Sequence, residues 1–264
     1  MAQPEGYVID DDLVAPELSV RGIAVHSVPW QQVGREDWSH VDGVVVRSTW
    51  DYYNDPDAFL EVLASVPTRM MNPLDTLRWN IDKRYLLDLR DSGVPIVPTR
   101  LVSDGRRPGP LDYPSVVKPR VSANSEGACV LRSPKDHARL PEGPSLVQPF
   151  VAEILGEGEL SLFFFDREFS HAIRKTPATG DFRVQEEHGG LIQPFTPPAE
   201  ALETARRALQ AVDGPLLYAR VDLVPFQGRH VVMELELIEP SMYLRMHPEA
   251  PARFAAAITA WLRP

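Results

Sequence analysis

Tyr218-Ala219-Arg220-Val221-Asp222 and, after a short bend, Val231-Val232-Met233-Glu234-Leu235-Glu236 are the two runs from which the fold can be argued. Apolar and charged residues alternate in both runs, which predicts two strands that each carry charge on one face. The bend from Pro225 to Arg229 contains Gly228, so we expect the two strands to form a hairpin.

Three carboxylates, those of Asp222, Glu234 and Glu236, are expected on one face of this hairpin, because side chains two residues apart on a strand point the same way. Carboxylates gathered in this way repel each other unless a cation lies between them, and such oxygen ligands suit Mg²⁺. Arg220 adds a fixed positive charge two residues before Asp222. The combination indicates phosphate chemistry. The alternative is an exposed hairpin whose charges are only solvated.

Length and composition describe a globular protein with a sizeable core. The chain has 264 residues, 44% hydrophobic and 24% charged, which is ordinary for this class. A net charge of −10 argues against nucleic acid as a partner. No apolar run approaches the roughly 18 residues of a membrane span, and the N-terminus lacks the features of a signal peptide. The single cysteine, Cys129, excludes an internal disulfide and predicts a reducing, cytoplasmic location.

Three α/β units are expected along the chain, at residues 1–75, 76–145 and 146–264. In the first unit, periodicity predicts helices over 11–21 and 57–65 and strands over 23–28 and 41–46. In the second, it predicts a helix over 82–91 and strands over 94–97, 115–118 and 128–131. In the third, it predicts strands over 160–165 and 169–174, a helix over 198–212, the hairpin, and a helix over 248–262.

Two lysines are candidates for contact with phosphate. Lys118 ends a predicted buried strand, where its amine is poorly placed for solvent and well placed for an anion. The loop from Arg120 to Gly127 is rich in small residues, and such loops expose backbone N–H groups that can hold phosphate oxygens. Lys83 falls in the first turn of a predicted helix, where it opposes the helix dipole and so hints at an anion. A plain hairpin loop and a surface lysine are the alternatives.

Two further segments suggest contacts with a nucleotide. Residues 146–151 form an apolar run with one amide, Gln148, which predicts a hinge whose backbone reads an adenine edge; a core strand with a turn is the alternative. Residues 177–190 form a long polar loop, and such loops often act as lids. Three basic residues in or beside this loop are expected to close over an anion: Arg174, Lys175 and Arg183.

The segment Arg47-Ser48-Thr49-Trp50-Asp51-Tyr52 follows the apolar strand expected at 41–46. Ligands of α/β sheets bind beyond the carboxyl ends of strands. Arg47 and Asp51 suit the charged ends of an amino acid, so the segment is a candidate for substrate binding. A loop that only packs Trp50 is the alternative.

Taken in order, these motifs resemble the ATP-grasp superfamily on its glutathione-synthetase-like side. The resemblance covers about residues 70–245 and includes Arg220-x-Asp222, which resembles the R-x-D of the D-alanine ligase branch. Arg183-x-Gln185 resembles the R-x-N of the closing loop, and Glu234-x-Glu236 stands where the family has E-x-N. The segments RSTWDY and RWNIDKRYLL resemble a narrower branch that includes a cyclo-ligase making cycloserine from O-ureidoserine.

The resemblance implies a three-lobed α/β ATP-grasp fold with ATP between the second and third lobes. It implies a reduced N-terminal lobe, because residues 4–11 look like the loop after a missing first strand. The implied reaction activates a carboxylate as an acylphosphate, which an amine then attacks. The implied roles are nucleotide binding by Lys83, Lys118, Gln148, Phe150, Val151, Glu159 and Lys175; catalysis by Arg183 and Arg220; substrate binding by Arg47, Ser48, Thr49, Asp51, Tyr52, Arg174 and Ser241; and binding of Mg²⁺, with Mn²⁺ as an alternative, by Asp222, Glu234 and Glu236.

Two other functions stay open at this point. An ATP-dependent small-molecule kinase needs the same metal and lysine set. A non-catalytic nucleotide-binding module is favoured only by the small-residue loop, which lacks the family's usual glycines, while retention of three carboxylates argues against it. The expected partner is a small amino-acid-like molecule, without nucleic acid or membrane. The sequence leaves open whether the new bond is intramolecular and whether the chain forms a homo-oligomer.

Overall fold

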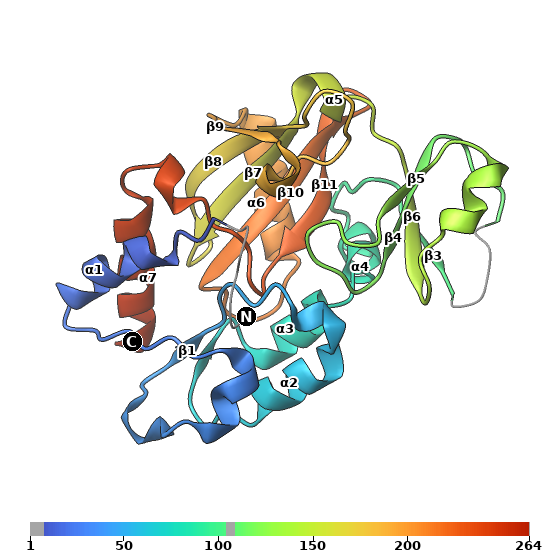
Figure 1. Cartoon of the computed structure of the whole chain (residues 1–264). Coiled ribbons are helices and arrows are strands. Elements are labelled where there is room, and N and C mark those ends of the chain that lie inside the picture. Colours follow the sequence, from blue (N-terminus) through green and yellow to red (C-terminus); the bar gives the residue numbers. More distant parts are fainter. Residues whose placement is uncertain (1–7, 104–108, 264) are drawn as a thin grey trace.

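The structure, a computed structural model, describes residues 8–103 and 109–263. Three sheets succeed one another along the chain (Figure 1). The first is a parallel pair, β1 (Val44–Val45) and β2 (Met70–Met71). The helices of this part are α1 (Val14–Ser19), α2 (Pro56–Ala64) and α3 (Leu74–Asn80), with 3-10 turns at Asp11–Leu13, Trp30–Arg35, Trp38–His40 and Tyr52–Asn54.

The strand expected at 23–28 is not formed. This apolar run has no strand beside it to pair with, and Val25 is 54% exposed. The sheet of this lobe therefore has two strands within the described residues. We expect residues 4–11 to follow a missing first strand, and the first half of that segment, residues 4–7, lies outside the described part of the chain.

The second sheet has the order β3-β6-β4-β5 and is antiparallel throughout. Its strands are β3 (Arg100–Val102), β4 (Ser115–Pro119), β5 (Cys129–Leu131) and β6 (Ser145–Pro149); α4 (Tyr85–Asp91) precedes it, and a 3-10 turn at Pro134–Arg139 precedes β6. Because β6 is its second strand, this sheet extends past the lobe boundary that we expected at 145. The strand expected at 94–97 makes only one bridge, from Ile96 to Val232, because it joins the outer edge of the third sheet instead.

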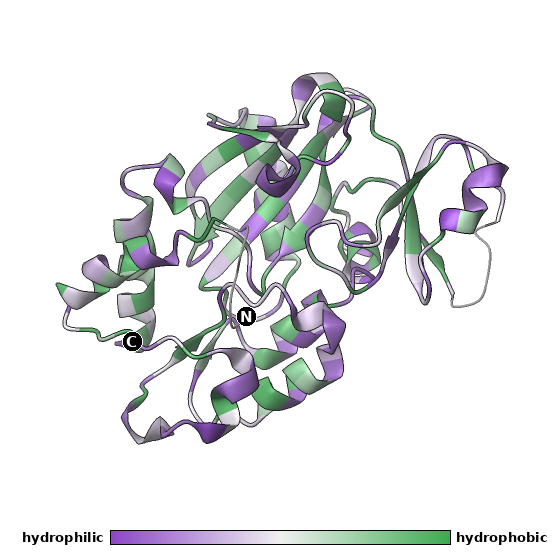
Figure 2. Ribbon diagram, in the orientation of Figure 1, coloured by the Kyte–Doolittle hydropathy of each residue, from purple (hydrophilic) through white to green (hydrophobic). Residues whose placement is uncertain are grey.

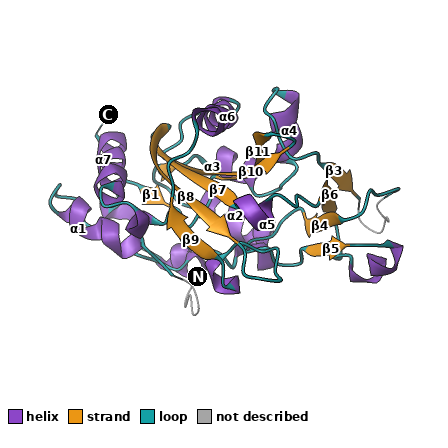
Figure 3. Cartoon of the chain, turned by 90° about the horizontal axis from the view of Figure 1, so that it is seen from above, coloured by secondary structure: helices purple, strands orange, loops and turns teal. Residues whose placement is uncertain are grey.

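The third sheet has five antiparallel strands in the order β11-β10-β7-β8-β9. They are β7 (Glu159–Phe165), β8 (Glu168–Thr176), β9 (Leu191–Pro194), β10 (Tyr218–Phe226) and β11 (Arg229–Glu236). The helices around it are α5 (Ile154–Glu157), α6 (Ala199–Gln210) and α7 (Ala250–Leu262), with 3-10 turns at Glu186–His188 and Leu244–Met246. Figure 3 shows α6 on one side of the sheet.

The period-two pattern of β7 and β10 gives this sheet two different faces. Leu162 and Val221 join the core beneath α6. On the opposite face, Phe163 and Tyr218 pack with Phe254 of α7 at one end. At the other end of that face, Ile154 of α5 packs near Val224, and the part between the two ends carries ionic residues. The sheet thus supplies an apolar core on one side and a polar floor on the other.

The predicted hairpin is confirmed. Gln227 and Gly228 form its two-residue loop with φ of 52° and 79°, the positive values that a tight hairpin turn requires. Asp222 pairs with Glu234 across the strands, and Arg220 pairs with Glu236. Hydrophobic residues concentrate in the strands of the third sheet (Figure 2). Among the described residues, no helix has the length and apolarity needed to cross a membrane.

Candidate active site

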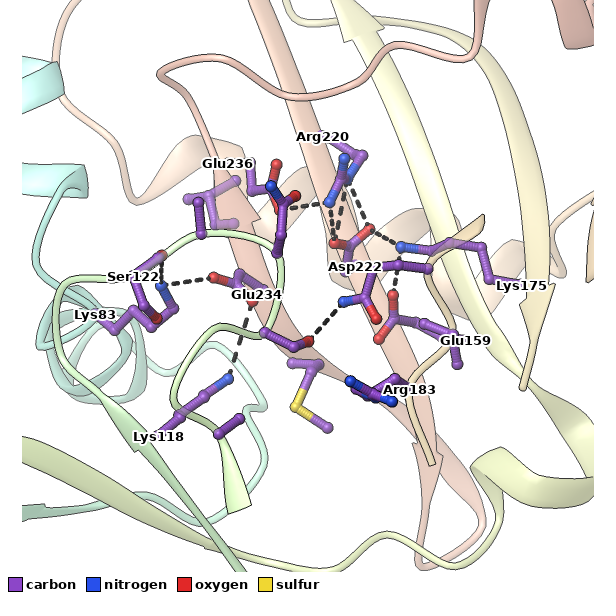
Figure 4. Close-up of a pocket in the computed structure, with 18 of the residues that line it drawn as sticks. Lys83, Lys118, Ser122, Glu159, Lys175, Arg183, Arg220, Asp222, Glu234 and Glu236 are labelled. Carbon is purple, nitrogen blue, oxygen red and sulfur yellow. Dashed lines mark hydrogen bonds and ion pairs between the residues drawn. The ribbon is translucent and has the colours of Figure 1, made fainter. Parts of the chain in front are cut away.

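The ionic face of the third sheet forms the floor of a cavity beside the second sheet. Residues of β4, β6, β7, β8, β10 and β11 line it, together with the loop after β4 and the loop before β9. Figure 4 shows Lys83 and Lys118 on one side of Glu234, with Asp222, Glu159 and Lys175 on the other. The cavity therefore brings together charged residues that lie up to about 150 positions apart in the sequence.

Arg220 is the central cation of this floor and is 9% exposed. Its Nε and Nη2 atoms donate to the two carboxylate oxygens of Asp222 at 3.1 and 2.9 Å. Nη2 also donates to Glu236, and Nη1 donates to the Ser241 carbonyl at 3.3 Å. A planar guanidinium suits this fork geometry, which a lysine cannot reproduce. The prediction that Arg220 faces the carboxylates is confirmed.

Both predicted nucleotide lysines reach the same carboxylate. The Nζ of Lys83 lies 3.2 Å from one oxygen of Glu234, and the Nζ of Lys118 lies 3.9 Å from the other. Lys83 is 6% exposed and also donates to the Ser122 carbonyl at 2.5 Å. Burial outweighs the nearby carboxylates and lowers the pKa of Lys118. Two buried amines that share one carboxylate leave positive charge available for an anionic ligand.

A second ionic group lies on β7 and β8. Lys175 is 3% exposed and contacts Glu159 at 2.5 Å and Asp222 at 3.5 Å. Burial favours the neutral amine, but Asp222 and Glu159 together raise the pKa of Lys175. Burial likewise opposes ionisation of Asp222, yet Arg220 and Lys175 lower its pKa to about 2. Both groups are therefore charged at neutral pH.

The three predicted metal ligands have the right chemistry and lie on one face. Burial and the neighbouring carboxylates of Asp222 and Glu234 raise the pKa of Glu236 to about 7, against the effect of Arg220. A divalent cation relieves this kind of repulsion. In the described chain, each of the three side chains is turned toward a lysine or arginine, and no three Asp, Glu, His or Cys residues converge into a ready metal site. The residues fit Mg²⁺ by chemical type, while their placement here is that of ion-paired side chains.

The predicted hinge residues line the cavity. Gln148, Phe150 and Val151 come from β6 and the residues after it. The Gln148 amide is buried and donates to the Thr99 hydroxyl at 2.9 Å, so it is fixed from behind by the start of the second sheet. The segment is both a core strand and a cavity wall, so the two alternatives considered for it do not exclude each other.

The loop from 177 to 190 lies against the cavity. Gln185 donates to the Ser125 hydroxyl at 2.7 Å, which joins this loop to the small-residue loop after β4. Arg183 lines the cavity but is held by Asp181 at 2.8 Å. Arg174 points elsewhere, because its guanidinium lies 5.0 Å from the ring of Phe195. Of the three basic residues expected to close over an anion, Arg183 and Lys175 line the cavity and Arg174 does not.

Most of the segment 47–52 lies behind the cavity. Arg47 donates to the carboxylate of Asp11 at 2.9 Å and to the Pro240 carbonyl at 2.7 Å. Ser48 donates to the same Asp11. Asp51 accepts hydrogen bonds from Trp30 and Gln31. Thr49 is buried, and its hydroxyl has no partner within the described structure.

Two of the seven predicted substrate residues, Tyr52 and Ser241, line the cavity. We therefore leave the other five out of the proposed substrate contacts: Arg47, Ser48, Thr49, Asp51 and Arg174. Other residues that no sequence pattern indicated also line the cavity, among them Glu239 and Tyr243. The only available signal was their nearness to Glu236, because the strand pattern ends there.

Solved structures with this fold include D-alanine–D-alanine ligase from Bacillus anthracis. It is 14% identical and has a TM-score of 0.65, over 94% of this chain and 89% of that chain. The ATP-grasp architecture expected from the sequence is therefore confirmed, and the cavity lies where its lysines and carboxylates converge. The fold is therefore the one shared by ligases of the ATP-grasp type.

Closer relatives define the family within this class. A family model described as the N-terminal domain of D-cycloserine synthetase DcsG matches residues 1–72. The cycloserine biosynthesis protein DcsG of Streptomyces lavendulae is 33% identical over 276 residues, 92% of this chain and 90% of that protein. The crystal structure of D-cycloserine synthetase DcsG is 30% identical with a TM-score of 0.84, over 96% of this chain and 94% of that chain. The chain belongs to the DcsG family of ATP-grasp ligases.

Proposed function

We propose that this enzyme activates the carboxylate of a small amino-acid-like substrate with ATP and closes an amide bond within the same molecule, as a cyclo-ligase of antibiotic biosynthesis. The observation that carries the proposal is the convergence of Lys83, Lys118, Arg220 and three carboxylates in one cavity beside the hinge. The family relationship supports it, since the relatives are named for cycloserine formation. O-ureidoserine is the first substrate to test.

The reaction has two steps. A carboxylate oxygen attacks the γ-phosphorus of ATP, the bond from that phosphorus to the bridging oxygen breaks, and ADP leaves. The nitrogen then attacks the acyl carbon, phosphate leaves, and the nitrogen gives up a proton. With O-ureidoserine that nitrogen carries a carbamoyl group, which leaves with water as ammonia and carbon dioxide. No protein side chain becomes covalently attached to the substrate in this scheme.

The cavity residues have separate tasks in these steps. Lys83 and Lys118 hold phosphate oxygens. In the structure both amines contact Glu234, and phosphate oxygens take the place of that carboxylate when ATP binds. Arg220 stabilises the acylphosphate and the tetrahedral intermediate. Arg183 adds a second positive charge once its ion pair with Asp181 is broken. The wall from Gln148 to Val151 receives the adenine, and Glu159 the ribose. Asp222, Glu234 and Glu236 would hold Mg²⁺, which neutralises phosphate charge when bound.

Replacement of Glu234 by glutamine tests the metal and phosphate assignment. The change keeps the side chain's shape and removes one of three oxygen anions, so we expect loss of turnover with the fold intact. The measurement is ADP release over a panel of amino acids and amines with Mg²⁺, with the product of each positive reaction identified by mass spectrometry. ADP release by this variant at the wild-type rate refutes the assignment. Phosphorylated substrate without amide as the final product indicates a kinase instead.

The buried free thiol of Cys129 agrees with a cytoplasmic location, which we include in the proposal. Burial raises the pKa of this thiol. It is therefore a packed side chain of the second sheet and not a nucleophile.

A further inference from the structure

One carboxyl group of the cavity has no role in the reaction described above. Glu239 lies in the loop after β11, lines the cavity and is 6% exposed. Within residues 8–103 and 109–263, no lysine, arginine or histidine forms an ion pair with it. Burial, followed by the nearby carboxylate of Glu236, raises the pKa of Glu239 to about 8. Lys83, the backbone N–H of Glu239 itself and Arg220 act in the opposite direction without overcoming burial. A buried carboxyl group of this kind is stabilised by a proton or by a cationic ligand.

Aromatic side chains accompany this carboxyl group. Trp50 and Tyr52 both line the cavity, and the Trp50 Nε1 donates to the backbone carbonyl of Glu239 at 3.0 Å. Tyr52 is 5% exposed, and after burial the largest influence that raises the pKa of its hydroxyl is the carboxyl group of Glu239. One face of the Tyr52 ring stacks on Phe59, at 5.2 Å between ring centroids. Aromatic side chains in the same cavity as a carboxylate suit an ammonium ion, which both attract.

The loop that carries Glu239 is held on both sides. The Arg47 guanidinium donates to the Pro240 carbonyl at 2.7 Å, and the Tyr218 hydroxyl contacts the Ile238 carbonyl at 2.7 Å. Arg220 contacts the Ser241 carbonyl two residues further on. Glu239 is thus held in a loop whose Ser241 carbonyl accepts a hydrogen bond from Arg220, the central cation of the floor.

We propose that Glu239, with the rings of Trp50 and Tyr52, binds the ammonium group of an α-amino acid substrate and makes the enzyme select amino acids over simple carboxylic acids. The inference rests on the proposed function, because it assumes that Arg220 receives the reacting carboxyl end. Glu239 thereby takes the contact with the ammonium end of the amino acid, which the sequence had suggested for Asp51. The carboxylate of Asp51 is already occupied by Trp30 and Gln31 at 2.9 and 2.7 Å.

The experiment compares two substrates and two variants. The substrates are O-ureidoserine and its analogue with hydrogen in place of the α-amino group, with ADP release as the readout. Glu239→Gln replaces the ionisable carboxyl group at constant shape, and Glu168→Gln makes the same replacement at an exposed position at the start of β8. A hydrogen bond to a charged group is worth about 1.5–3 kcal/mol, so we expect wild-type kcat/KM to favour O-ureidoserine by roughly 10- to 150-fold.

Glu239→Gln should reduce this preference to within about threefold by raising the KM for O-ureidoserine, with the KM for ATP unchanged. Glu168→Gln should keep the full preference. Equal use of both substrates by the wild type overturns the ammonium subsite while the ligase activity stands, and that result does not depend on any variant folding. A full preference retained by Glu239→Gln overturns it as well. If neither substrate causes the wild-type enzyme to release ADP, the proposed function itself is refuted.

Discussion

Replacement of Arg220 by alanine is the perturbation whose consequences the structure defines most fully. The guanidinium makes two contacts to Asp222, at 3.1 and 2.9 Å, and one each to Glu236 and the Ser241 carbonyl. Its loss leaves Asp222 with Lys175 at 3.5 Å as its remaining cation, and it removes the cation of Glu236. Breaking a buried ion pair from one side costs about 3–5 kcal/mol of folding stability.

The catalytic effect should exceed the effect on binding. Loss of one donor to a developing oxyanion typically lowers kcat about 10²–10³-fold. Lys83 and Lys118 remain in place to hold phosphates, so the KM for ATP should rise by less than about tenfold. Arg220→Lys keeps the positive charge without the planar fork, so its kcat should lie between those of the alanine variant and the wild type.

The assay is coupled ADP release at saturating ATP, with thermal unfolding and ATP titration on the same preparations. Thermal unfolding separates a folded but inactive variant from a destabilised one. Near-normal kcat combined with a large loss of ATP affinity refutes the reasoning, because it makes Arg220 an ordinary phosphate ligand. An Arg220→Lys enzyme as slow as the alanine variant contradicts the intermediate rate expected for it and shows that charge without the planar fork contributes nothing.

Other predictions concern the nucleotide, the loop and the core. Lys118→Ala should weaken ATP binding by about 1–3 kcal/mol, and unchanged affinity by calorimetry makes Lys118 structural. Residues 176–190 should gain protection from hydrogen exchange only with ATP and Mg²⁺, because glycines and polar residues give them little apolar surface to bury; equal protection in both states indicates a fixed loop. Burial lowers the pKa of His171 to about 4 from 6.5, so its contribution to stability is complete above pH 6.5 and is lost as pH falls toward 4. Urea unfolding at pH 7 and pH 4 should show a pH-dependent loss smaller by about 3 kcal/mol in His171→Gln than in wild type, and an equal loss in both contradicts the assignment.

The sequence predicted the hairpin and its charged face because a strand repeats every two residues. That period alone places Glu234 and Glu236 on the same face of their strand. The pairing of the two strands places Asp222 beside Glu234 and Arg220 beside Glu236. The prediction of a strand at 23–28 was wrong, because an apolar run forms a strand only where another strand can pair with it. The helix α3 (Leu74–Asn80) was not predicted from the sequence.

Tertiary contacts decided which polar residues enter the cavity. Arg47 and Asp51 follow an expected strand, yet Asp11, Trp30 and Gln31 occupy their side chains. No local pattern specifies these partners, which come from other parts of the first lobe. Glu239 lies beyond the end of β11, where the period of the strand no longer fixes the direction of a side chain. Its place in the cavity depends on the loop that Trp50 and Arg47 hold.

Oxygen transfer from the substrate to phosphate tests the proposed acylphosphate most directly. With O-ureidoserine labelled by ¹⁸O in its carboxylate, attack on the γ-phosphorus carries one labelled oxygen into the phosphate that is later released. Mass spectrometry of the phosphate after one turnover should show one ¹⁸O atom per molecule, and ADP should show none. Unlabelled phosphate released together with cyclised product contradicts activation of the carboxylate.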